Sequence, residues 1–535
     1  MSVFAPPDRT SRFLDWTARA IIAVSLVIGI GYPLLALVST AVLLDTNLRR
    51  LQVVEAVFWS TLDSAIAALV VTAVAGIVVA LVRSLPRRLA HVFDVLLLIP
   101  AAFSPFVISG AIGRGIGRGG FLDPGFLPPF MGRAALLASF TVALFPYAYA
   151  LLRVSIWNVP LTLIDVSRVN GASEWNIFKN TVWPSLRRGL PLAWLVVFML
   201  AVSDPIVPTL LSYPHPNASR AVWVLTTALG DTGGAARISL ALLLATFSLG
   251  ALGYRILGSR LFLPTLHGSG PASNRVSFSQ PVAMAIWPRI AFPSLVSALL
   301  LLPIVFMFHG ARAQWDPAFP TVIRTAAEIS VFTVAGSIVI AGSGLWIKAR
   351  NPHSYLVDIL FGLVLLMPGA TTGTSLSLAY GPSSLLAASL SPTSQSLLSS
   401  ALIVIAYLTL SAPLTYLSVR AYGTVLPRQD FETALTLGAS VAKAARVASQ
   451  TWLRQSVVMS VTIVLAVSAV SVAPIMWVTT PSTPLLVPYL FRLVDHSEFG
   501  TASTLALMIS AIVLLLLITT TVILSVRFIR KIGRS

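Results

Sequence analysis

Apolar residues run along this chain in long blocks, and polar residues gather in the short stretches between them. A helix needs about 20 apolar residues to cross a bilayer, and these blocks are of that length. They lie near 20–44, 57–82, 90–112, 134–152, 190–212 and 238–258, and then near 290–308, 329–347, 355–380, 397–419, 456–478 and 502–526. The pattern predicts an all-α membrane protein with about twelve transmembrane helices.

Two of the polar stretches repeat each other. The first extends from Pro160 to Pro191 and the second from Pro427 to Arg454. Matched positions are 267 residues apart (438 less 171), and they include Pro146/Pro413, Tyr149/Tyr416, Arg153/Arg420, Pro160/Pro427, Asp165/Glu432, Gly171/Gly438, Ala172/Ala439 and Ser173/Ser440. This register predicts a duplication into two tandem six-helix halves. An even number of spans gives both halves one orientation, so we expect a pseudo-two-fold axis along the membrane normal.

The repeat divides the chain into two predicted domains, 1–262 and 289–535. Between them, residues 263–288 are polar and rich in Gly, Ser and Pro, which is typical of a flexible linker. Each half contains one repeated stretch, which we name hairpin 1 (158–188) and hairpin 2 (427–455).

Each hairpin has the local pattern of a helix, a tight turn and a second helix. Gly171 and Gly438 are expected to take the left-handed backbone geometry that ends a helix. Ser173 and Ser440 then stand where the next helix needs an N-cap. A surface helix hairpin would explain one copy, but two copies in register indicate a shared role.

The composition fits a polytopic membrane protein. The chain has 535 residues, of which 56% are hydrophobic and only 10% charged, and its mean hydropathy is +0.88. No soluble domain of this size is so poor in charge. The absence of Cys excludes disulfides, Cys-ligated metals and thiol catalysis.

The basic residues predict the orientation. With the N-terminus placed in the cytoplasm, 26 of the 36 Lys and Arg fall in segments on the cytoplasmic side and 10 outside. The positive-inside rule therefore favours cytoplasmic N- and C-termini. The formal charge of +18 then reflects membrane topology, and we expect no nucleic-acid partner.

Signatures of catalysis are absent from the sequence. No Lys follows a Gly, so there is no Walker A loop and the chain is not its own ATPase. The His-Glu-x-x-His and Gly-x-Ser-x-Gly motifs are also missing. We expect no enzymatic activity, no cofactor and no metal site.

The third predicted span of each half is interrupted by Pro and Gly, in Pro100–Pro105 and in Pro368–Gly373. Backbone groups freed at such a break must be buried in protein or line a cavity. The breaks are therefore either packing kinks or walls of a translocation path, with Ser104, Thr371 and Thr372 as polar candidates.

The fifth spans carry a second matched set of polar residues. In the first half, Ser203 and Asp204 precede Pro205. In the second half, Ser468 and Ser471 are the polar residues expected on the facing wall of the path. Asp204 either bonds to a neighbouring helix or faces a polar path, since an isolated carboxylate in hydrocarbon is costly.

The hairpins resemble the cytoplasmic coupling loop of binding-protein-dependent ABC importer permeases, whose pattern is Glu-Ala-Ala, three residues, then Gly. Asp165-Val-Ser replaces Glu-Ala-Ala in hairpin 1, and Glu432-Thr-Ala replaces it in hairpin 2. Thr451 stands at the position matched to Pro184, so hairpin 2 lacks this proline. We therefore expect hairpin 1 to contribute more to the coupling contact than hairpin 2.

The resemblance implies a type I ABC importer permease fold in the plasma membrane of a prokaryote. It implies two ABC ATPase subunits on the cytoplasmic side and an extracytoplasmic solute-binding protein as partners. ATPase contacts are expected at Asp165, Gly171, Ala172, Ser173, Glu432, Gly438, Ala439 and Ser440.

The solute is less well defined. The fused arrangement and the stretches Ser203–Leu211 and Gly230–Ala236 are similar to the ferric-iron and phosphonate branch, with thiamine or a polyamine left open. The alternative class is an ion-coupled secondary transporter, for which Asp63 and Asp204 are the only intramembrane acids considered. A third class, an intramembrane enzyme, lacks a catalytic constellation.

Overall fold

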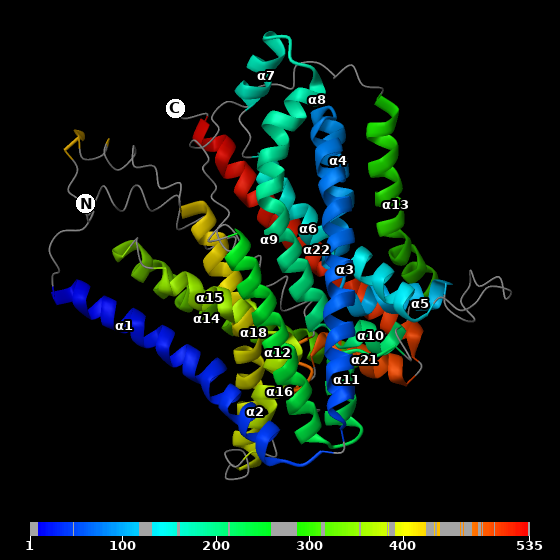
Figure 1. Cartoon of the computed structure of the whole chain (residues 1–535), viewed down its shortest axis with the longest axis vertical. Helices are drawn as coiled ribbons and strands as arrows, with labels where there is room; N and C mark the ends of the chain where they lie inside the picture. The colour runs from blue at the N-terminus through cyan, green and yellow to red at the C-terminus, as the bar shows by residue number, and fades with distance from the viewer. Residues whose placement is uncertain are drawn as a thin grey trace.

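The computed structural model describes most of the chain. It covers residues 9–257 apart from 47, 117–130, 158–160 and 212–214; residues 286–423 apart from 312–315, 352–354, 382–383 and 385–390; and residues 473–532 apart from 480–482, 484 and 497. Between 424 and 472 it describes only 433, 436–438, 461 and 464. The regular elements in these residues are all helices (Figure 1).

The helices follow one another with short connections. Those of the first half are α1 (Arg9–Leu26), the π-helical turn η1 (Val27–Gly31), α2 (Tyr32–Leu43), α3 (Arg50–Arg83), α4 (Arg87–Leu98), the 3₁₀ turn η2 (Ile99–Ala102), α5 (Pro105–Ile116), α6 (Arg133–Trp157), α7 (Leu161–Val169), α8 (Glu174–Ile177), the π-helical turn η3 (Phe178–Val182), α9 (Trp183–Ser203), α10 (Ile206–Leu211), α11 (Ala218–Thr227) and α12 (Thr232–Leu257). Those of the second half are α13 (Ile286–Gly310), α14 (Phe319–Arg350), α15 (Leu356–Leu365), α16 (Gly369–Tyr380), α18 (Pro392–Gly423), α21 (Leu486–Asp495) and α22 (Phe499–Ile532).

Seven of the described helices are long and apolar enough to cross a membrane, or ten if each bent helix pair forms one span. These ten coincide with ten of the twelve segments predicted from the hydrophobic pattern. Of the other two, 456–478 lies mostly outside the described residues and 502–526 falls within α22. The protein is therefore an all-helical, multi-pass membrane protein. Most of the predicted linker also lies outside the described residues.

The helices α3, α6 and α9 pack extensively against one another. Ala67, Val71, Ala75 and Val78 are fully buried on α3 and recur every three to four residues, so they form one face of that helix. Small side chains on such a face let neighbouring backbones approach closely, which favours helix association inside a membrane. In the second half, α14 packs along α18 in the same way that α3 packs along α6.

The first helices of each half pack against helices of the other half. α1 packs along α14 and α2 against α16, whereas α13 packs against α3, α4 and α5, as Figure 1 also shows for α13 and α4. Trp346 Nε1 donates to Asp15 Oδ1 over 2.7 Å, and the Tyr380 hydroxyl donates to the Ile28 carbonyl over 3.0 Å. The two halves are consequently interlocked and form one helical body.

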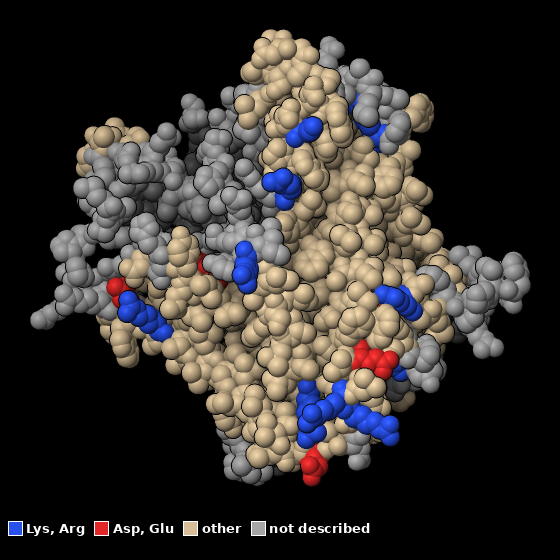
Figure 2. Space-filling view, viewed as in Figure 1, with Lys and Arg blue, Asp and Glu red and all other residues tan. Residues whose placement is uncertain are grey.

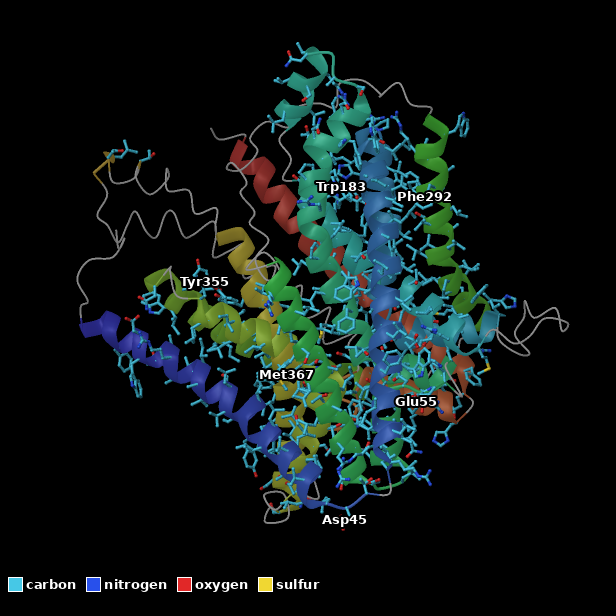
Figure 3. The ribbon with its side chains drawn as sticks, viewed as in Figure 1. Asp45, Glu55, Trp183, Phe292, Tyr355 and Met367 are labelled. Atoms are coloured by element: carbon cyan, nitrogen blue, oxygen red, sulfur yellow. The ribbon has the colours of Figure 1, made fainter. Side chains whose placement is uncertain are left out.

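The surface is that of a protein in contact with lipid. Large apolar side chains such as Leu35 (69% exposed) and Phe332 (66% exposed) point outward from α2 and α14. Figure 2 shows a face made mostly of uncharged atoms, with few charged residues, gathered most closely at its lower end. In Figure 3, Asp45 marks that end and Trp183 lies toward the opposite one.

Candidate functional site

Hairpin 1 projects from the upper end of the molecule in Figure 1 as α7, a tight turn and α8. Gly171 has φ +76°. Its N–H donates to the Arg168 carbonyl over 2.9 Å, and the Ala172 N–H donates to the Ser167 carbonyl over 3.0 Å. This pair of bonds around a left-handed residue is the Schellman motif, which satisfies the last carbonyls of a helix. The predicted left-handed turn is confirmed.

Hairpin 2 has a left-handed glycine at the matched position. Gly438 has φ +82°, and the Leu437 N–H donates to the Thr433 carbonyl over 3.0 Å. The prediction of a left-handed glycine is thus confirmed at both matched positions. The other predicted contact residues of this hairpin, Glu432, Ala439 and Ser440, lie outside the described residues.

Hairpin 1 has an exposed apolar face on α7, next to an exposed Trp175. Leu163, Val166 and Val169 recur every three residues on α7 and are 53%, 56% and 88% exposed, and Trp175 on α8 is 69% exposed. Ser173 caps α8 by accepting the Asn176 N–H over 3.4 Å, as predicted. Apolar side chains gathered on a projecting turn mark a contact surface for protein or membrane.

The second arm of hairpin 1 leads directly into the fifth span. α8 passes through η3 into α9, and Pro184 lies in the first turn of α9. Proline has no N–H to donate to the preceding turn, so it suits a helix start. The π-helical turn before it widens the helix where that bond is missing.

The predicted interruption of both third spans is confirmed. The segments Arg88–Ala102 and Pro105–Ile116 meet at 94°, and Leu356–Leu365 and Gly369–Tyr380 meet at 91°. Pro105 starts one new helix, and Pro368 stands directly before the other. Met367, beside the second break, lies in the middle of the molecule in Figure 3.

The polar candidates at the two breaks have different surroundings. The Ser104 hydroxyl accepts the Val107 N–H over 3.3 Å and borders a small cavity with room for about one water molecule. Residues of α21 and α22 form the other side of this cavity, including Val487 and Ser510. Thr371 and Thr372 instead lie in packed protein, where their hydroxyls donate to backbone carbonyls over 3.1 Å. Ser104 therefore borders a small cavity lined by the second half, whereas Thr371 and Thr372 are buried in packed protein.

Asp204 has a local structural role. It lies at the break between α9 and α10, is 7% exposed, and its Oδ1 accepts the N–H groups of Ile206 and Val207 over 2.8 and 3.0 Å. The carboxylate thus caps α10, which accounts for its burial. Ser203 lies beside it at the end of α9, whereas Ser468 and Ser471 lie outside the described residues.

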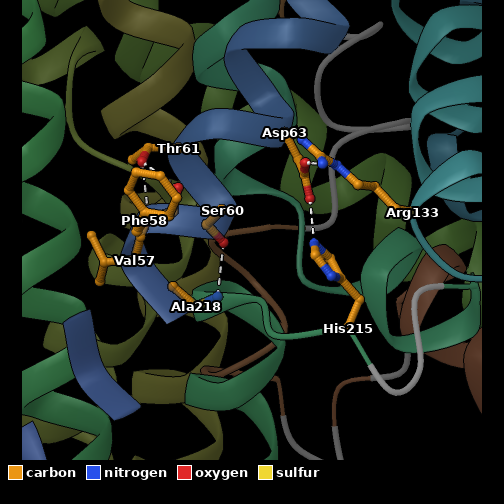
Figure 4. A network of polar contacts seen from close by, with 8 residues as sticks. All are labelled: Val57, Phe58, Ser60, Thr61, Asp63, Arg133, His215 and Ala218. Atoms are coloured by element: carbon orange, nitrogen blue, oxygen red, sulfur yellow. Dashed lines mark hydrogen bonds and ion pairs between the residues drawn. The ribbon is translucent and has the colours of Figure 1, made fainter. Parts of the chain in front are cut away.

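Asp63 lies in a polar network (Figure 4). Arg133 Nε contacts Asp63 Oδ1 at 2.6 Å, and His215 Nε2 contacts Oδ2 at 2.7 Å. The guanidinium carbon of Arg133 lies 5.0 Å from the Trp59 ring centroid. This network ties the starts of α6 and of the α11 segment to α3, so Asp63 acts as an anchor between elements.

Two buried acids were missed by the sequence reasoning, which considered only Asp63 and Asp204 inside the membrane. That view was wrong, because Asp94 and Asp358 lie within the third spans and are 7% and 4% exposed. Tyr149 and Tyr416, a matched pair of the repeat, donate to them over 2.7 and 2.6 Å. The matched tyrosines were the available signal, since a buried hydroxyl needs a partner.

No group of three His, Asp or Glu among the described residues could hold a metal ion. No protein-family model matches the sequence, and no curated protein matches it.

Proposed function

We propose that this protein is the transmembrane permease of an ABC importer, with two six-helix halves fused in one chain. The observation that carries this proposal is the pair of hairpins, whose turns have a left-handed glycine at matched positions, Gly171 and Gly438. An importer driven by two ATPases needs two rigid contact elements on one side of the membrane, one for each ATPase. A duplicated chain supplies both contact elements, with their matched residues 267 positions apart.

The hairpins are the proposed ATPase contacts. Hairpin 1 presents Leu163, Val166, Val169 and Trp175 on its exposed face, and an apolar element of this kind fits a hydrophobic groove on a partner. Asp165, Gly171, Ala172 and Ser173 lie in or beside it, and the matched residues of hairpin 2 are Glu432, Gly438, Ala439 and Ser440. The Schellman turn gives the contact a fixed shape, which transmits a push better than a flexible loop.

The proposed ATPase contacts also set the orientation of the chain in the membrane. The hairpins and both termini face the cytoplasm, where the excess of Lys and Arg is predicted, and twelve spans are related by a pseudo-two-fold axis. A solute-binding protein delivers the solute at the opposite face. The membrane is the plasma membrane of a prokaryote.

The translocation path runs between the halves, past the two breaks. Ser104, Thr371 and Thr372 belong to the breaks, and Ser203, Asp204, Ser468 and Ser471 to the fifth spans. The solute is ferric iron or a phosphonate-type compound, with thiamine or a polyamine as alternatives. Measuring which of these the partner solute-binding protein binds would identify the solute.

A second candidate is an ion-coupled secondary transporter, which the buried acids Asp63, Asp94, Asp204 and Asp358 favour, since such transporters use intramembrane carboxylates. Three of these acids have a cationic side chain within 3.0 Å and the fourth caps α10. Their structural partners make the importer the better proposal.

The test is purification from the native membrane under mild detergent, followed by uptake in proteoliposomes. We expect an ABC ATPase to co-purify in two copies per permease and uptake to require ATP inside the vesicle. Uptake that persists without an ATPase and stops when the ion gradient is collapsed would establish the secondary transporter instead.

A further inference from the structure

Each half contains a cluster of an aspartate, a tyrosine and a cation, in which the aspartate comes from the third span and the tyrosine from the fourth. In clasp 1 (Asp94, Tyr149 and Arg153), the Tyr149 hydroxyl donates to Asp94 Oδ1 over 2.7 Å and Arg153 contacts Oδ2 at 2.5 Å. The carboxylate is therefore held from both of its oxygens.

Clasp 2 (Asp358, Tyr416 and Lys348) has the same arrangement. The Tyr416 hydroxyl donates to Asp358 Oδ1 over 2.6 Å, and Lys348 Nζ lies 3.0 Å from Oδ2. Tyr149 and Tyr416 are among the largest fully buried side chains of the protein. Burial strengthens such hydrogen bonds, because no water competes for the hydroxyl or the carboxylate.

The clasps are alike in geometry although their residues are not all matched in sequence. The tyrosines are 267 residues apart, but the aspartates are 264 apart. Asp94 lies eleven residues before Pro105, where α5 starts, and Asp358 lies eleven before Gly369, where α16 starts. The two carboxylates therefore stand at the same chain distance from the helix that follows each break. The cations differ more, since Arg153 comes from α6 and Lys348 from α14.

The position of each clasp links a hairpin to a break. Tyr149 and Arg153 lie in the last turns of α6, which is followed directly by hairpin 1. Asp94 lies on α4, whose far end is the 94° break. In the second half, Tyr416 lies on α18, which leads toward hairpin 2, and Asp358 lies on α15, which ends at the 91° break.

We propose that the two clasps are the positioning contacts that carry hairpin movement to the mid-membrane breaks. The inference rests on the proposed importer function. A push on a hairpin displaces the cytoplasmic end of the fourth span, and the clasp obliges the first arm of the third span to follow. That arm is short, so its displacement changes the angle at the break and with it the opening of the path.

The decisive variant is Tyr149→Phe combined with Tyr416→Phe, which removes two hydroxyls and keeps both rings. The reporter is Ser104→Cys, placed at the first break in a chain that has no other Cys. In the complex with its ATPases, we expect ATP to change the rate of N-ethylmaleimide labelling at this Cys by about fivefold or more, the size of a typical coupling between sites. In the double variant, the change should fall below about twofold while ATPase binding and ATP hydrolysis persist.

The matched control is Tyr147→Phe, two residues earlier on the same helix, which should keep the full response to ATP. Each single clasp variant should give an intermediate response, and these also serve if the double variant does not accumulate. A lowered thermal midpoint with an unchanged labelling response would assign the clasps a merely structural role and overturn the inference. Failure of the parent protein to bind any ATPase would instead overturn the proposed function, and the inference with it.

Discussion

The left-handed turns of the hairpins allow a perturbation confined to the backbone. A Cβ added at Gly171 or Gly438 would meet no atom of the described residues within 4 Å, so it causes no clash with them. The cost of Gly171→Val and Gly438→Val comes only from φ values of +76° and +82°, which β-branched residues avoid. That strain is about 1–3 kcal/mol at each turn. The turns should open while the membrane-spanning helices remain unchanged.

We expect the double valine variant to insert and accumulate normally but to bind its ATPases weakly and to lose most ATP-driven uptake. Replacing the same glycines by Asn should retain most of the function, because Asn tolerates the left-handed region. The assays are pull-down of the ATPase and uptake in proteoliposomes.

Gly230→Val is the matched control for this prediction. Gly230 has φ +65°, and a Cβ there would also meet no atom within 4 Å. It follows α11, which lies at the opposite end of the molecule from α7 (Figure 1). An equal loss of ATPase binding in this variant, or normal uptake in the double valine variant, would refute the assignment of the hairpins.

Three further outcomes are expected. Gly171→Val alone should reduce ATPase binding more than Gly438→Val alone, because Pro184 stiffens the helix that follows hairpin 1; equal losses in a pull-down would contradict this. Asp204→Asn keeps an oxygen that can cap α10, so the protein should accumulate while uptake falls, and unchanged uptake would remove this residue from the path. Arg133→Gln breaks a partly exposed pair with a buried carboxylate, which should lower the free energy of unfolding by about 1–3 kcal/mol; an unshifted thermal midpoint would show that His215 alone holds the network.

Much of the fold was predictable from the sequence because its causes are local. The bilayer sets the length of each apolar block, so the positions of ten spans could be predicted before any packing was known. The turns at Gly171 and Gly438 depend only on residues within one helical turn. Pro105 and Pro368 have no N–H to donate, so each interrupts helical hydrogen bonding at its own position, and both breaks were also predictable.

The side-chain partners were not predictable in this way. Asp94 and Tyr149 are 55 residues apart, and Asp63 and Arg133 are 70 apart. Which acid meets which donor depends on how the helices are rotated against one another. The sequence reasoning therefore considered Asp63 and Asp204 but overlooked Asp94 and Asp358.

The sequence by itself determined which segments form helices of membrane-spanning length, where the chain repeats, and where its helices break. Only the tertiary structure decided that α1 crosses to α14, that the first break faces a cavity, and that two aspartates are held by matched tyrosines. The physical reason is that lipid is as apolar as a helix surface. Hydrophobicity therefore specifies that a helix lies in the membrane but not which of its faces meets a neighbour, and close packing and buried hydrogen bonds make that choice.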